Sequence, residues 1–153
     1  RSIPFIILIV LLIPLSRFLV GTGSGVTGSF VALVFGTVPF FARQIESVLS
    51  EIDHGLVEAS AAMGFSPRQI IFGVYLRESI PGITRVTMIT FVSFVGITAI
   101  AGAIGAGGIG DFAIRYGYQM GYRDMIWLTV LIILAIISIF QFFGNMIIRR
   151  TTH

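Results

Sequence analysis

Long apolar runs dominate this sequence and restrict what the chain can fold into. Four candidate membrane spans cover residues 3–20, 26–49, 81–104 and 125–148. At 1.5 Å per residue, the third makes roughly 36 Å of α-helix, enough to cross about 30 Å of hydrocarbon with some tilt. Charged residues are 11% of the chain, against about 25% in a soluble domain. The sequence therefore predicts an all-α, polytopic transmembrane bundle, with residues 1–153 forming a single domain.

The beginning of the chain does not fit a secretory signal. Pro4, Pro14 and Arg17 interrupt the first apolar run, and no small-residue cleavage site stands out. The first residue is Arg1, and the chain enters the apolar run almost at once. We expect an N-terminal part to be missing from this sequence.

Composition argues against several classes of function. Without cysteine there is neither a disulfide framework nor a thiolate metal site. His54 and His153 are too far apart to form a metal site by spacing, so we expect no metal. All basic side chains are arginines spread along the chain, which disfavours a nucleic-acid partner. Asp53 and His54 have no companion nucleophile nearby, so we expect no catalytic residues.

The most polar part of the chain, residues 50–80, separates the second and third spans. We expect two short helices in this loop. The first covers roughly Leu56 to Met63, with an apolar stripe along one side. The second begins at the sequence SPRQ, with Ser66 as N-cap, Pro67 at the first helical position and Gln69 closing a capping box.

The arginines indicate an orientation in the membrane. If residues 50–80 face the cytoplasm, seven arginines lie inside and three outside, in agreement with the positive-inside rule. The C-terminal tail is then cytoplasmic as well. Aromatic belts sit at membrane interfaces, and one such group falls at the expected outer side: Tyr116, Tyr118, Tyr122 and Trp127.

A glycine-rich segment at residues 105–110 matches the pattern G-x-G-x-x-G of dinucleotide-binding loops. That fingerprint requires a preceding strand and an acidic residue about twenty positions later. Here a membrane-length apolar run precedes it, and the later position falls inside another apolar run. A nucleotide site is therefore not predicted.

Small residues recur at every third position before these glycines. Such a row is a ridge on a helix, but it drifts by about 60° per step and cannot face one partner throughout. Close helix packing is the favoured interpretation; the alternative is that part of the ridge lines a solute path between protomers. As possible path or gate residues we select Gly96, Ile97, Ile100 and Gly102. The ridge consists of Thr84, Thr87, Thr90, Ser93, Gly96, Ala99, Gly102 and Gly105. A polar stripe on the last span is expected to pack against a sister helix: Ser138, Gln141, Asn145 and Arg149.

The loop sequence EASAAMGFSPRQIIFGVYLRESIPG resembles the EAA loop of ABC-importer permeases. Glu58, Ala59 and Gly64 match the family pattern, whereas Ser60 replaces its second alanine. Arg77 stands where the pattern has a proline, which puts the local turn in doubt. The resemblance implies that Glu58, Ala59, Ser60 and Gly64 belong to a coupling helix that fits a cleft on a cytoplasmic ATPase.

The whole of residues 1–153 is similar to permeases of bacterial methionine importers, chiefly through GAIGAGGIGDFAIRYGYQMGY. This resemblance implies a multi-pass protein of the bacterial cytoplasmic membrane that conducts methionine. It also implies two permease copies, two ATPase subunits, an external substrate-binding protein and an additional N-terminal helical region before residue 1. The chain has no Walker A pattern, so it is not expected to be an enzyme, and ATP and magnesium belong to the partner ATPase.

Three alternatives remain open on the sequence. The solute could be another small amino acid or organic molecule, because no charged pocket is visible. A channel or structural assembly subunit would need no protruding coupling element. A membrane enzyme would need convergent ionisable residues inside the spans, and these hold almost none beyond their ends.

Overall fold

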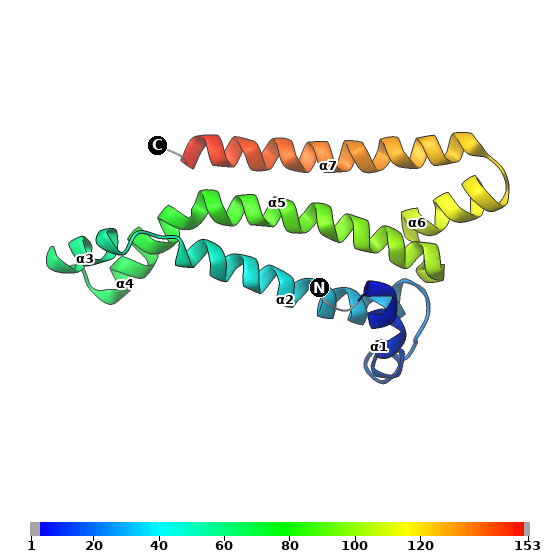
Figure 1. Cartoon of the computed structure of the whole chain (residues 1–153), viewed down its shortest axis with the longest axis horizontal. Helices are drawn as coiled ribbons and strands as arrows, with labels where there is room; N and C mark the ends of the chain where they lie inside the picture. The colour runs from blue at the N-terminus through cyan, green and yellow to red at the C-terminus, as the bar shows by residue number, and fades with distance from the viewer. Residues whose placement is uncertain (1–3, 152–153) are drawn as a thin grey trace. The chain divides into compact units, whose positions relative to one another are not determined.

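A computed structural model describes residues 4–151 of the chain, and within that range every regular element is a helix (Figure 1). The α-helical and π-helical (η) elements follow one another with short turns between them. They are α1 (Phe5–Val20), α2 (Gly25–Ser50), α3 (His54–Ala62), α4 (Pro67–Gln69), η1 (Ile70–Tyr75), α5 (Leu76–Ala101), η2 (Gly102–Ala106), α6 (Gly108–Phe112), η3 (Ala113–Gln119) and α7 (Arg123–Thr151).

Three helical stretches among the described residues are long and apolar enough to cross a membrane: Gly25–Ser50, Pro67–Ala106 and Arg123–Thr151. The predicted all-α membrane bundle is therefore confirmed. The second and fourth predicted spans agree closely with α2 and α7. The apolar helix α1 is 16 residues long and shorter than a usual span. Whether residues 3–20 belong to a span stays a prediction, and residue 3 lies outside the described range.

The third span differs from its prediction. The helix that starts at Pro67 does not end inside the loop but continues through Pro81 into α5, which ends at Ala101. The predicted second short loop helix is therefore wrong as a separate element. Gly73 does not end the helix within the loop, because it is absent from the positions with positive φ. Pro81 removes one backbone donor but leaves the helix unbroken, as neighbouring hydroxyl groups and local π geometry allow in membrane helices.

The described chain folds as two compact units. The first combines the chain up to Phe40 with Thr90–Ile139, and the second combines Phe41–Ile89 with the chain from Phe140 onward. The helices α2, α5 and α7 each contribute to both. The second unit contains the predicted coupling loop together with the end of α7.

In the first unit, α1 packs closely against α2 through small residues. The buried Ser16 hydroxyl donates to the Gly28 carbonyl oxygen at 2.8 Å. A Cβ at Gly28 would lie 2.6 Å from the Gly23 carbonyl carbon, so glycine is required at this approach. Hydroxyl bonding to backbone satisfies a polar side chain inside an apolar bundle.

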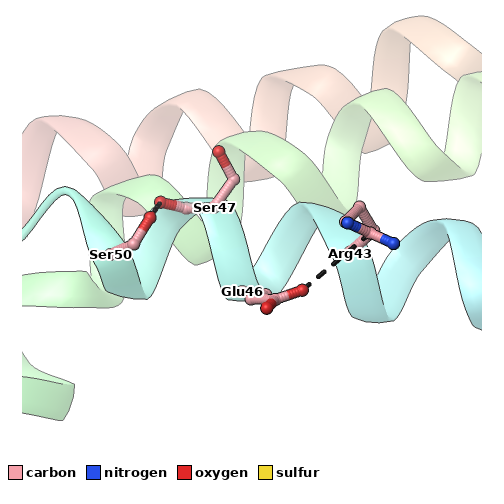
Figure 2. A network of polar contacts seen from close by, with 4 residues as sticks. All are labelled: Arg43, Glu46, Ser47 and Ser50. Carbon is pink, nitrogen blue, oxygen red and sulfur yellow. Dashed lines mark hydrogen bonds and ion pairs between the residues drawn. The ribbon is translucent and has the colours of Figure 1, made fainter.

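In the second unit, the charged residues near the end of α2 bond within their own helix (Figure 2). Arg43 Nε lies 3.9 Å from Glu46 Oε2, and the Ser50 hydroxyl donates to the Ser47 carbonyl at 2.8 Å. The two charged side chains are 85% and 75% exposed. An ion pair this exposed contributes little to stability, so these contacts do not fasten α2 to another element.

Most of α7 is uncovered within this chain. Only 6% of its most apolar window is buried. An apolar helix with so little protein around it must meet lipid or another protein chain.

Candidate functional site

The loop between α2 and α5 begins with a capped helix. Asp53 is the N-cap of α3, and its Oδ1 accepts a hydrogen bond from the Gly55 backbone N–H at 2.8 Å. The helix therefore begins at His54, two residues before the predicted Leu56. The predicted start at Leu56 would place Glu58 near the beginning of the helix, but Glu58 falls in the middle of α3, so that expectation is wrong. The N-cap residue Asp53 marks the start of the helix more accurately than the apolar stripe does, because the Asp53 carboxylate accepts a hydrogen bond from a backbone N–H that the helix leaves free.

The residues of the predicted coupling motif point in different directions. Glu58 and Ala59 are exposed, whereas Ser60 is only 4% exposed. The Ser60 hydroxyl donates to the Leu56 carbonyl oxygen at 2.7 Å. Serine can therefore stand at a buried position of this helix, since its own backbone satisfies the hydroxyl group. In this motif, Glu58 and Ala59 are available to a partner, whereas Ser60 packs inside the chain.

Gly64 ends α3 in a Schellman motif. Its φ is +83°, its N–H donates to the Ala61 carbonyl at 3.0 Å, and the Phe65 N–H donates to the Ser60 carbonyl at 3.1 Å. These bonds satisfy carbonyls that the end of the helix would leave free. Space around Gly64 is open, so its backbone conformation and not crowding requires glycine.

The predicted capping box at the start of α4 is confirmed. The Ser66 backbone N–H and hydroxyl both donate to Gln69 Oε1, at 2.8 and 2.9 Å, and Pro67 occupies the first helical position. Only two residues, Phe65 and Ser66, stand between the Gly64 turn and α4. The two termini thus hold α3 and α4 in a compact pair beyond the end of α2 (Figure 1).

Apolar side chains are uncovered on this helix pair. Met63 is 67% exposed and Phe72 is 71% exposed. An open groove of about 490 Å³ is lined by residues that include Phe65, Arg68 and Phe72. The sequence prediction missed both phenylalanines, although two aromatic residues flanking a capping box in a polar loop were a usable signal. Exposed apolar groups rimmed by charge are typical of a protein-binding surface.

The glycine-rich segment forms a tight turn, and α6 folds back on the end of α5 (Figure 1). A Cβ at Gly102 would lie 2.6 Å from the Asp111 backbone nitrogen, and one at Gly110 would overlap the Ala99 carbonyl oxygen. Gly105 (φ +90°) is one of the glycines here with positive φ. A helix and not a strand precedes this segment, so the rejection of a dinucleotide loop is consistent with the structure. The glycines allow backbone to approach backbone.

The predicted ridge of small residues at every third position is interrupted at this turn. It can follow α5 only as far as the end of that helix at Ala101, since Ile104 and Gly105 leave helical geometry. Thr84 and Thr87 direct their hydroxyl groups to carbonyls of their own helix, at 2.8 and 2.7 Å. The predicted continuous ridge from residue 84 to 105 is therefore wrong at its end.

The four selected path residues have different surroundings. Gly96 and Ile100 are exposed on α5, and a Cβ at Gly96 would meet no atom within 4 Å. Ile97 is half-buried, and Gly102 is buried in the turn. A cavity of about 170 Å³ lies beside the turn in the first unit, but none of the four lines it. Gly96 and Ile100 are thus available to a partner or solute, whereas Gly102 serves the packing of this chain.

No group of three potential ligand side chains that could hold a metal ion occurs within residues 4–151. The expectation about His153 lies outside the described residues.

Comparison with known proteins now adds to this geometry. The family model described as "Binding-protein-dependent transport system inner membrane component" matches residues 1–153. The chain belongs to this family. It is an inner-membrane component of a transport system, and the predicted resemblance to importer permeases is confirmed.

Two curated members of this family are similar over nearly the whole chain. The probable D-methionine transport system permease protein MetI of Vibrio cholerae is 43% identical over 153 residues, which are 100% of this chain and 68% of that protein. The methionine import system permease protein MetP of Bacillus subtilis is 44% identical over 147 residues, 96% of this chain and 66% of that protein.

A solved structure of the same family has the same fold. It is the MetNI methionine ABC transporter in inward-facing conformations, in its CY5 native crystal form. One chain of it matches with a TM-score of 0.88 at 43% identity, over 100% of this inner-membrane component and 71% of that chain.

Proposed function

We propose that this chain is the permease subunit of an ATP-binding cassette importer and carries methionine across the bacterial cytoplasmic membrane. The similarity of this whole chain to 71% of a chain of the MetNI methionine ABC transporter, at 43% identity and a TM-score of 0.88, carries the proposal. Curated relatives named as methionine permeases support the choice of solute.

The loop that carries α3 and α4 is the proposed docking element for a separate ATPase. Glu58 and Ala59 are exposed on α3, and the Gly64 turn leaves the groove beside Phe65 and Phe72 open. Ser60 supports α3 from its buried side. ATP and magnesium would be used in that ATPase, and this chain would need no cofactor.

The complete importer in this proposal has two copies of this chain, two ATPase subunits and an external substrate-binding protein. The exposed surface of α7 supports contact between the two copies. Polar residues in membrane helices usually face protein and not lipid, and α7 exposes a stripe of them: Ser138, Gln141, Asn145 and Arg149.

The solute path is proposed to run beside α5. Gly96, Ile97 and Ile100 are the residues of this path or gate, because the outer two are exposed and Gly96 leaves open space. Gly102 shapes the turn that ends this segment.

The proposal is tested by uptake of labelled methionine into vesicles that contain the full permease, its ATPase and its binding protein. We expect accumulation that requires hydrolysable ATP and is competed by unlabelled methionine. Accumulation competed only by another amino acid or organic solute would replace the substrate but keep the importer. Entry that needs neither ATP nor the ATPase would favour the channel alternative and refute the importer.

A further inference from the structure

A hydrogen bond joins the predicted coupling loop to the end of α2. Tyr75, the last residue of η1, donates its hydroxyl to the Leu49 carbonyl oxygen at 2.6 Å, and the bond is partly buried. The two residues are 26 positions apart and lie in the same unit. The bond therefore crosses between two elements, unlike the Arg43–Glu46 and Ser50–Ser47 contacts within α2 (Figure 2).

The Leu49 carbonyl is suited to receive such a bond. It belongs to the last turn of α2, where carbonyls have no intrahelical donor and need another partner. The chain turns away after Ser50, and the Glu51 N–H donates instead to the Val48 carbonyl at 3.3 Å. Tyr75 thus satisfies a carbonyl oxygen at the end of α2.

A second contact holds the same part of α2. A Cβ added to Gly82 would lie 2.5 Å from Val48 Cγ1, so the backbone of α5 packs directly on the valine next to Leu49. Gly82 is seven positions after Tyr75, about two helical turns, and shares its face. Ser79 lies between them, is 2% exposed, and donates its hydroxyl to the Tyr75 carbonyl at 2.5 Å.

Together these residues lie on one face of the helix, called the contact face below, on which Tyr75 and Gly82 meet α2. Tyr75, Ser79, Gly82 and Val86 follow the spacing i, i+4, i+7, i+11, and Val86 is 9% exposed. This spacing keeps side chains on one side of a helix. In the sequence, this face starts just after Phe72 and Gly73, two residues that line the exposed groove.

We propose that Tyr75 is a positioning residue that ties the coupling loop to α2, so that movement of the loop is passed to that membrane helix. This inference rests on the proposed function, because it assumes that an ATPase moves the loop. An apolar contact such as Val48 on Gly82 resists separation but lets surfaces slide. A hydrogen bond to a fixed carbonyl has a preferred distance and direction and resists sliding.

The test compares the full permease with its Tyr75→Phe variant, each assembled with ATPase and binding protein in proteoliposomes. The variant removes one oxygen atom and keeps the ring. We expect ATPase binding and ATP hydrolysis to continue, while methionine imported per ATP hydrolysed falls about two- to tenfold, as loss of one ordinary hydrogen bond predicts.

The ratio of import to hydrolysis separates this role from simple stabilisation. A variant that only lowers the number of folded transporters reduces import and hydrolysis together and leaves their ratio unchanged, which would overturn the tie. Tyr118→Phe is the matched control, since it removes the same hydroxyl from a side chain that is 79% exposed. It should keep the ratio of the unmodified protein.

A second variant alters the packing of α5 on α2 and leaves Tyr75 unchanged. Gly82→Ala pushes α5 away from Val48 and should also lower the ratio. A normal ratio in Tyr75→Phe would refute the tie, whatever Gly82→Ala does, as long as the unmodified chain still imports solute. An unmodified chain without ATP-driven import would refute the proposed function and this inference together.

Discussion

The two glycines Gly96 and Gly102 are predicted to respond in opposite ways to the same substitution. A Cβ at Gly102 would lie 2.6 Å from the Asp111 nitrogen and 2.8 Å from both the Gly107 oxygen and the Gly110 Cα. These distances are 0.8 and 0.6 Å below the 3.4 Å at which ordinary contact begins. All three partners are backbone atoms that cannot rotate away, so the α5–α6 turn must open.

The cost follows from that crowding. Overpacking a tight site costs about 1–3 kcal/mol, and rigid partners put Gly102→Ala near the upper end. Gly96→Ala meets no atom within 4 Å and should gain about 0.8–1 kcal/mol of helix propensity. The two variants should therefore differ by about 3–4 kcal/mol. At about 2–4 °C per kcal/mol for a chain of this size, their melting temperatures should differ by about 10 °C.

The measurement is thermal unfolding of the detergent-solubilised permease, followed by loss of its monodisperse chromatographic peak. Gly102→Ala should melt below the unmodified protein and Gly96→Ala at or above it. Gly96→Leu tests whether a partner or solute uses the surface at Gly96. If one does, this variant should keep the melting temperature of the unmodified protein but lower uptake. Equal melting of the two alanine variants would refute the packing argument for the turn.

Three further predictions concern the loop and the orientation of the chain. Gly64→Val should destabilise the end of α3 by about 1–2 kcal/mol because the φ of Gly64 is +83°, and binding of the ATPase in a pull-down should fall. Gly96→Ala, at an open helical position outside the loop, should bind the ATPase normally. Glu58→Lys should leave membrane yield unchanged and abolish ATP-driven uptake; normal uptake would remove this exposed carboxylate from the docking surface. Because the chain has no cysteine, single cysteines report sidedness: an impermeant external reagent should label Tyr118→Cys but not Ser50→Cys in intact cells, and the reverse labelling would invert the orientation.

The sequence predicted features that depend on local chemistry. Apolar runs gave α2 and α7 within a few residues, because length and hydropathy alone decide whether a helix suits a bilayer. The capping box of Ser66 and Gln69 was also predictable, since all its groups lie within one turn. The start of α3 was missed although Asp53 is an ordinary N-cap residue, because the predicted bounds followed the apolar stripe alone.

Features that depend on contact between two helices could not be predicted from local sequence patterns. The predicted ridge of small residues at every third position includes Thr84 and Thr87, whose hydroxyl groups bond to their own helix. The contact face found in the structure instead combines small and large residues at alternating spacings of four and three: Tyr75, Ser79, Gly82 and Val86.

This difference has a geometric cause that bears on how movement reaches α2. A row spaced by three drifts by about 60° at each step, so its members turn away from any single partner. Alternating steps of four and three keep returning to one side, which lets a helix meet the same neighbour over several turns. A contact also needs a large residue to fill the space that a small one leaves, as Val48 does over Gly82. Small residues alone reveal only half of such a contact, and a tyrosine at its end, bonded to the last turn of α2, supplies the directional link that close packing lacks.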